Sequence, residues 1–594
     1  MTAEIARSEW VAPRGFLRGL RGRFNIWHYV LLALVTMAVA MPFLFLILGS
    51  FSQARMPGDF SFSTLGLQNH IKVWSDPTTY ATFVNTLWYV CGSTLFGLGL
   101  ATLLAWLVER TDIPGKVWIY AAVPMTLAMP GMLQAMAWVL MLSPKIGFFN
   151  KTMMTNFGLT EAPLNIYSLG GMIFVEGLRL VPTAFLMLVP LLKSMDPTLE
   201  EAAAMSGASG LRTLRRVTVR LLLPGLMAVA IYQFITALEV FEIPGILGLP
   251  AGIYVFSTKI YAVLNSANFL PNYGEANALA MLYLVVAVFA TAAYSKVIAR
   301  AERFSIVTGK GYRPRIQSLG RWRYAALAVV IFYLLFSVIL PALVLAYISF
   351  MPFLQTPSIA SLSRLTLDNY RTVFAMDRMG TVLGNTLMMA GITSVATILL
   401  SFCVSLVVVR SKFWGRKLLD QLVFLPHAIP GIVMGLAMLW VFLKVDKLGV
   451  PLFGTVWSVC IVFTIGFMSY GTRAMNSAIL QIHKDLEEAA QVSGAPQWRV
   501  MRRVFFPLLL PTIVGIGIWT TLHAVRLASQ PLIMTEGEKN ELLAVTIWNL
   551  WGEGQAVVVG AIGTMMVLAL LLLTLLLRFV TARHGVRSQE AASS

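Results

Sequence analysis

The sequence predicts an all-α polytopic membrane protein in which about twelve transmembrane helices form two parallel-oriented six-helix repeats. Hydrophobic residues fill 58% of the 594 positions and charged residues only 12%, and the mean hydropathy is +0.76. A soluble protein of this length needs far more polar surface. The apolar runs are continuous, whereas strands of a membrane β-barrel are short and alternate, so a barrel is excluded.

Apolar runs long enough to cross a bilayer as helices, which takes about 20 residues, follow one another along the whole chain. We count twelve: residues 29–50, 84–108, 117–142, 168–192, 221–240, 276–298, 325–350, 383–409, 418–443, 456–478, 507–527 and 557–580. No convincing cleavage site follows the first run, so we expect it to remain as a span. Cys91, Cys403 and Cys460 lie inside spans, which argues against disulfides and cysteine metal sites.

An internal repeat relates the two halves of the chain. The stretch LEEAAAMSGA at 199–208 returns as LEEAAQVSGA at 486–495, an offset of 287 residues. Upstream of it the offset is 300, as for Asn85-Thr86-Leu87 and Asn385-Thr386-Leu387. The first half therefore carries 13 extra residues, which we place in the external loop around 143–167, where insertions are tolerated. Six spans per half give both halves the same orientation.

The net charge of +18 is concentrated at points that set the orientation of the chain. Arginines and lysines precede the first span, fill the linker at 299–323, close the chain, and follow both repeated stretches. By the positive-inside rule all these segments face the cytoplasm, as do both termini, and the lipid bilayer rather than nucleic acid explains the charge. We expect a multi-pass protein of a bacterial inner membrane.

Each repeated stretch reads as a short helix that ends at a glycine, Gly207 in the first copy and Gly494 in the second. At 1.5 Å per residue such a helix is about 15 Å long, with glutamates in its first turn and small alanines that let another surface approach. One copy alone would read as a solvated loop helix. A solvated face has no reason to match its twin, so two near-identical copies favour a docking element.

The sequence here resembles the permease subunits of binding-protein-dependent ABC importers of the type I fold. The resemblance rests on Glu-Ala-Ala, three residues, then Gly, ahead of a basic segment and a proline, in both halves. In that family this loop is the coupling helix that enters a groove on the ATPase subunit. By position, the resemblance implies the coupling residues Glu200, Glu201, Ala202, Ala203 and Gly207, and Glu487, Glu488, Ala489, Ala490 and Gly494. The family's proline is present at Pro507, but Arg220 replaces it in the first half, so we expect the fifth span to start differently there.

The partners follow from what the chain lacks. No GxxxxGK[ST] motif occurs, so ATP hydrolysis is expected in a separate subunit, and the chain itself is neither an enzyme nor a binder of cofactors. Because both permease lobes are fused, the resemblance implies two copies of an ATPase subunit and a periplasmic solute-binding protein. Among such permeases, LEEAA followed by SGA in a fused chain is most similar to the ferric-iron group; thiamine, phosphonate and polyamine systems remain alternatives.

Ionisable residues inside spans are costly and are candidates for the transport pathway. Glu239 aligns with Arg526, and Thr236 with His523, at the offset of 287. Glu239 and Arg526 could form an ion pair across the two halves or line the pathway with His523; alternatively they snorkel to the water boundary. Glu176 and Arg179 are three residues apart on one helix and should pair locally.

His427 and the methionines are candidate ligands that have simpler structural explanations. We expect His427, between two prolines, to be satisfied by backbone carbonyls. No cluster of His, Cys or carboxylates has metal-ligand spacing, and packing explains the methionines.

The predicted organisation divides the chain into permease domains and connecting segments. They are a cytoplasmic arm, first span and external loop (1–82), a first permease domain (83–298), a basic linker (299–324), a seventh span with its loop (325–381), a second permease domain (382–580) and a cytoplasmic tail (581–594). A secondary transporter would also show twelve spans, but it needs embedded carboxylates and no matched cytoplasmic helices. A helix-turn-helix DNA reader needs a three-helix core, which about 25 residues between spans cannot build.

Overall fold

The computed structural model describes residues 16–593, except 55, 60, 195–201, 204, 214, 215, 218, 266–270 and 305–315. Throughout this part of the chain the protein is helical, and only isolated β-bridges occur. The first half contains α1 (Phe16–Phe51), α2 (Gln68–Ser75), α3 (Pro77–Arg110), α4 (Lys116–Met125), α5 (Gly131–Leu142), α6 (Phe148–Phe157), α7 (Leu169–Ser194), α9 (Gly210–Thr213), α10 (Val219–Glu239), α11 (Glu242–Leu247), α12 (Phe256–Leu264) and α13 (Tyr273–Phe304).

The second half repeats this order. It contains α14 (Trp322–Leu334), α15 (Leu340–Ser349), α16 (Ile359–Leu362), α17 (Asp368–Ala375), α18 (Met379–Ser405), α19 (Arg416–Phe424), α20 (Gly431–Asp446), α21 (Val456–Gln481), α22 (Lys484–Val492), α23 (Gln497–Val500), α24 (Phe506–Arg526), α25 (Pro531–Met534), α26 (Leu543–Gly552) and α27 (Ala556–Ser593). α10 and α24 begin and end at residues exactly one offset of 287 apart, so Arg220 does not shift the start of the fifth span as we expected.

The predicted membrane helices are present, but two of them are broken. Among the described residues, nine helices are long and apolar enough to cross a membrane, and up to twelve if each of three bent helix pairs is one span. The predicted spans 117–142 and 418–443 bend by 91° and 110°. In both, the bend precedes a Pro-Gly pair, because proline cannot continue the hydrogen-bond ladder of the preceding helix.

The remaining spans differ from the prediction in detail. The third bent pair, at 242–264, turns by 70° and lies where no span was predicted. The tenth predicted span is continuous as α21, although it is less apolar than the nine. The extra length predicted for the first external loop contains α6, and the matching loop between α20 and α21 has no helix.

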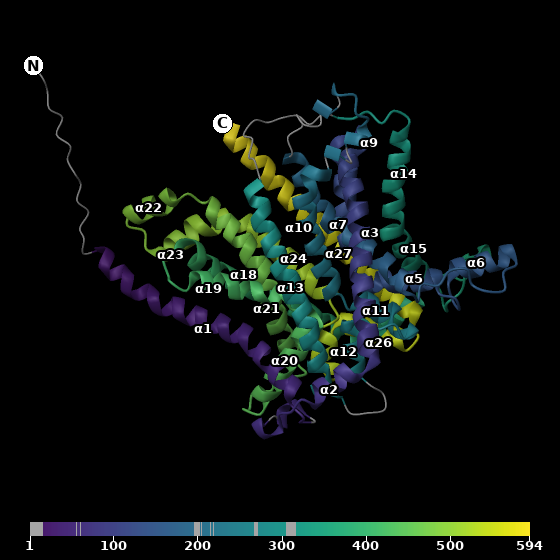
Figure 1. The fold of residues 1–594 in the computed structure, drawn as a ribbon, viewed down its shortest axis with the longest axis horizontal. Helices are drawn as coiled ribbons and strands as arrows, with labels where there is room; N and C mark the ends of the chain where they lie inside the picture. Colours follow the sequence, from purple (N-terminus) through teal and green to yellow (C-terminus); the bar gives the residue numbers. More distant parts are fainter. Residues whose placement is uncertain are drawn as a thin grey trace, which may run out of the picture.

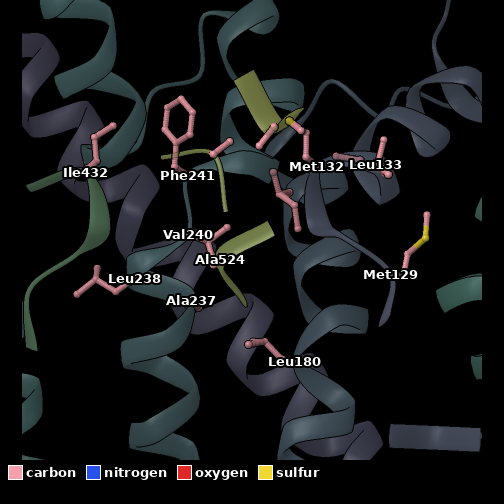
Figure 2. Close-up of a cluster of buried hydrophobic side chains, with 14 of the residues drawn as sticks. Met129, Met132, Leu133, Leu180, Ala237, Leu238, Val240, Phe241, Ile432 and Ala524 are labelled. Atoms are coloured by element: carbon pink, nitrogen blue, oxygen red, sulfur yellow. The ribbon is translucent and has the colours of Figure 1, made fainter. Parts of the chain in front are cut away.

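Each half packs on the other through its first span. α1 packs on α13 of its own half and on α20 of the other, and α15 packs in the same way on α27 and α5. Figure 1 shows α1 running along the outside of the second half, beside α19 and α20. The hydrophobic core is continuous across the halves: Figure 2 shows Met129 and Met132 at the first bend together with Ile432 and Ala524 of the second half.

Candidate functional site

Matched hydrogen bonds show that the sequence repeat is also a repeat of contacts. Thr86 Oγ1 accepts from the backbone N–H of Phe256 at 3.0 Å, and Thr386 Oγ1 accepts from that of Leu543 at 2.9 Å. We call these two contacts the threonine pins. Each connects the second span of a half, α3 or α18, to the first residue of α12 or α26, so the hydroxyl satisfies an N–H at a helix start.

A second matched contact lies at the opposite end of each half. The guanidinium of Arg110 donates to the Leu192 carbonyl and that of Arg410 to the Ile479 carbonyl, both at 3.1 Å. These arginines cap the last carbonyls of the fourth span, where the helix dipole favours a cation. We call this end of each half, which carries residues 202–213 in one and Lys484–Val500 in the other, the repeat end.

The repeated stretch has the same geometry in both copies. Gly207 and Gly494 each have a φ of +77°, the left-handed conformation that glycine adopts freely. In both copies the next residue closes the helix, since the N–H of Ala208 donates to Ala203 O and that of Ala495 to Ala490 O, each at 3.0 Å. The predicted stops at the two glycines are therefore confirmed.

The second copy shows how the coupling candidates are divided. Glu487 lies 4.0 Å from Arg410, so it ties α22 to the end of α18. Glu488 and Ala489 are exposed, and Ala490 is half-buried. In the first copy Ala202 is exposed and Ala203 is half-buried, while Glu200 and Glu201 lie outside the described residues.

The tip of each stretch is a position that sequence reasoning missed. Met205 is 89% exposed and Val492 is 88% exposed, at the same place one offset of 287 apart. An exposed apolar side chain at the same place in both copies is consistent with a shared interaction surface. The signal was available in the sequence, because this position differs between the copies yet stays apolar in both. Figure 1 shows α9 and α22 well apart, each beyond the bundle of its own half.

A polar cluster lies where the two halves meet. Glu176, fully buried on α7, pairs with Arg179 at 2.6 Å, so the predicted local pair is confirmed. Arg526 donates to Leu127 O of the other half at 2.8 Å and lies 2.6 Å from His523 Nε2. A charged group buried at this depth needs such partners.

Of the alternatives left open for Glu239 and Arg526, the ion pair is not the one that the structure contains. No ion pair joins them among the described residues. The carboxylate that bonds across the boundary is Glu242, which accepts from the N–H of Ala528 in the other half at 3.1 Å. The break between α10 and α11 turns the chain before it reaches Glu242, which a straight span would not do.

Aromatic rings continue the cluster into the second half. Trp519 stacks between Tyr470 at 3.8 Å and His523 at 3.9 Å, as measured between ring centroids. His523 Nδ1 lies 2.9 Å from Trp519 O, so a proton on Nδ1 lets Nε2 accept from Arg526. His427, which we expected to bond to backbone carbonyls, stacks on Tyr232 of the first half at 6.1 Å.

The chain is similar in sequence to known membrane transport proteins. Residues 397–585 match the family of binding-protein-dependent transport system inner membrane components. A ferric transport system permease protein of Actinobacillus pleuropneumoniae is 25% identical over 84% of this chain and 70% of its own length. An Fe(3+)-transport system permease protein of Haemophilus influenzae is 19% identical over 89% of this chain and 93% of its own.

Among solved structures, a bacterial ABC transporter involved in alginate import is 19% identical, with a TM-score of 0.36, over 44% of this chain and 94% of that one. The sequence matches and the duplicated helical architecture together confirm the predicted resemblance to fused ABC importer permeases of the ferric-iron group. The chain is thus similar to these permeases, and its long apolar helices are those of a multi-pass membrane protein.

Proposed function

We propose that this chain is the membrane subunit of an ATP-driven importer that passes a small solute, ferric iron as first candidate, from a periplasmic binding protein to the cytoplasm. The observation that carries the proposal is the matched pair of repeat ends, with the same glycine φ of +77° and the same closing hydrogen bond of 3.0 Å. Two exposed helix ends of matching geometry on one chain fit two copies of one partner subunit.

The repeat ends face the cytoplasm in this proposal, because arginines such as Arg499, Arg502 and Arg503 follow the second copy. Each then inserts its apolar tip, Met205 or Val492, into one ATPase subunit. Glu487 lies 4.0 Å from Arg410 and Asp485 lies 3.1 Å from His483, so Glu488 is the carboxylate of α22 that we assign to the partner. By equivalence, Glu201 takes this role in the first copy.

Alternating access follows from the contacts between halves. ATPase closure would draw the two repeat ends together and rock the halves about their common axis. The cross-half contacts of Arg526 with Leu127 and of Glu242 with Ala528 lie on this boundary, so they are the ones that must break and re-form. On this ground we assign Arg526 and its neighbour His523 to the pathway, and we keep Glu239, which aligns with Arg526, as a further pathway candidate.

The substrate is proposed from the relatives, which are named as ferric and Fe(3+) transport permeases. Within the described residues no group of three His, Cys, Asp or Glu side chains could hold a metal ion. The chain therefore passes the cargo on, and the binding protein selects it. Thiamine, phosphonate and polyamine are the alternatives that the test below separates.

The test is uptake of radioactive iron by cells that express the chain with its neighbouring genes. Uptake should stop when ATP is depleted with arsenate and should persist with a protonophore that leaves ATP intact. The opposite pattern would show a proton-coupled secondary transporter. Uptake of labelled thiamine, a phosphonate or a polyamine instead of iron would replace the substrate and leave the class intact.

Variants connect this uptake to the repeat ends. Met205→Asp/Val492→Asp should abolish uptake and co-purification of the ATPase, because a charge cannot enter an apolar groove without a partner. Ile359→Asp/Leu448→Asp is the matched control, since these side chains are 91% and 80% exposed in other loops. Glu201→Lys/Glu488→Lys should behave like the first variant. Normal uptake by either repeat-end variant would exclude the coupling role.

A further inference from the structure

A cavity at the repeat end of the second half is unrelated to the coupling helices. It occupies about 360 Å³ between the end of α18 and the start of α19. Its lining is cationic and aromatic: Lys412, Phe413, Trp414, Arg416 and Lys417. A cavity of this size is within the range of small-ligand sites.

The surroundings of this cavity are of the kind found where a span meets the lipid headgroups. Trp414 Nε1 donates to the Tyr29 hydroxyl at 3.1 Å, and the Phe413 ring packs on Tyr29 at 5.1 Å between centroids. Both contacts are with the start of the first span, where Trp27 and Val30 are about half exposed on the outside of the bundle. Tryptophan and tyrosine gather where a span meets the headgroup layer.

The cations of the cavity are available for a ligand. Lys412, Arg416 and Lys417 are all exposed, and none of them forms an ion pair with a carboxylate in the part of the chain that the structure describes. The nearest acidic residue in sequence, Asp420, pairs with Arg473 at 3.6 Å. Arg416 is oriented by its bond to Ser411 O at 3.1 Å.

The corresponding loop in the first half differs in charge and in the segment that it contacts. Lys412 corresponds to Asp112 at the offset of 300, and Asp112 accepts from the N–H of Leu319 at 2.7 Å and from the Ser318 hydroxyl at 3.0 Å. The first-half loop is thus covered by the chain that leads into α14. The second-half loop has Lys412 at this position and Lys417 where the first half has Val117, and it contacts α1 instead.

We propose that the cavity binds the phosphate of an anionic phospholipid headgroup, with phosphatidylglycerol as the probe. Arg416 offers a planar fork to two phosphate oxygens, the lysines supply point charges, and the exposed Trp414 ring lies against the glycerol region. Basic pockets between spans are where such headgroups bind. The bound lipid would bridge the first span to the second half, on which it already packs.

The experiment uses the purified full chain in detergent and measures thermal unfolding and lipid retention by native mass spectrometry. Phosphatidylglycerol should raise the unfolding temperature more than phosphatidylcholine does. Lys412→Gln/Arg416→Gln/Lys417→Gln should lower the apparent affinity for phosphatidylglycerol by about tenfold or more, given the attraction of each cation near an anionic surface, and leave the response to phosphatidylcholine unchanged.

Three arms make the result decisive. Lys116→Gln/Arg321→Gln/Arg323→Gln removes as many cations from the repeat end of the first half and should keep the preference for phosphatidylglycerol. An equal loss of this preference in that variant would show that general surface charge explains the effect, and would overturn the site. Inorganic phosphate should not reproduce the stabilisation, and if it does the ligand is free phosphate and not lipid. If the triple variant aggregates, Lys412→Gln/Lys417→Gln carries the same test, and unchanged lipid retention in it overturns the proposal.

Discussion

Thr86 in the first half and Thr386 in the second accept the same hydrogen bond, and Asn85 and Asn385 beside them donate to equivalent carbonyls, both at 3.2 Å. At the centre of the molecule this agreement ends. The buried pair Glu176–Arg179 has Phe463 and Gly466 as its counterparts, and Glu239 has Arg526. Contacts that hold each half in shape have been kept in both copies, whereas the side chains at the boundary between halves have diverged.

This difference between matched and unmatched contacts indicates which parts of a duplicated membrane protein are constrained by folding. A pin satisfies a buried backbone N–H, which costs free energy wherever it is left unpaired, so both copies need it. A charge at the centre has no such local necessity. Its presence in one half and absence from its twin means that the two halves differ in charge at their boundary.

The largest expected effect comes from breaking the central pair of the first half. Arg179→Leu leaves Glu176 buried without its cation, and removal of one partner of a buried pair costs about 3–5 kcal/mol. The free energy of unfolding, measured by titration with a denaturing detergent in mixed micelles, should fall by this amount.

The matched control places the residues of the second half at the equivalent positions of the first half. Glu176→Phe/Arg179→Gly copies Phe463 and Gly466 and removes both charges together, so most of the lost stability should return, while uptake should remain impaired. If the double variant is as unstable as Arg179→Leu, packing and not the unpaired charge explains the loss. If uptake is normal, the central charge is dispensable.

A smaller effect is expected where α3 and α7 touch. A Cβ on Gly97 would lie 2.8 Å from the Gly177 carbonyl, whereas one on Gly99 would meet nothing within 4 Å. Gly97→Val should therefore cost about 1–3 kcal/mol through overpacking, and Gly99→Val should cost far less in the same titration. The second half has Thr397 at this position, so Thr397→Val should be tolerated. Equal losses for Gly97→Val and Gly99→Val would contradict the close contact.

The threonine pins test the symmetry itself. Thr86→Val and Thr386→Val each keep the shape of the side chain and leave a buried N–H without an acceptor, at a cost of about 1–2 kcal/mol. The two losses should agree within about 0.5 kcal/mol and should add in the double variant, because distant sites act independently. A loss of stability in only one half would mean that the two hydrogen bonds, although alike in geometry, do not stabilise the protein equally.

Much of this architecture was predictable, since helical spans need only long apolar runs and the duplication is written in matched residues such as Gly207 and Gly494. The repeat also located the pins, although not their partners. What could not be predicted is how broken helices place side chains. Glu242 lies only three residues after Glu239, but the break before α11 decides which of them reaches the backbone of the other half. Glu242 could have been noticed because it lies beside Pro244, whose counterpart is Pro531.

The smallest effect concerns the loop that differs most in charge. The hydrogen bonds from the Leu319 N–H and the Ser318 hydroxyl hold the pKa of Asp112 below its ordinary value of 3.8. A carboxyl whose pKa is lowered on folding stabilises the folded contact fully above the ordinary pKa and loses this contribution as pH falls through the lowered value. Hydrogen exchange at the Leu319 amide, corrected for intrinsic pH dependence, should therefore accelerate only below pH 3.8. Asp112→Ala should exchange faster at every pH, whereas Lys412→Ala, the counterpart in the second half, should leave Leu319 unchanged; protection of Leu319 that survives in Asp112→Ala would show that the isolated bridge between Thr111 and Gln317 holds this segment without the carboxylate.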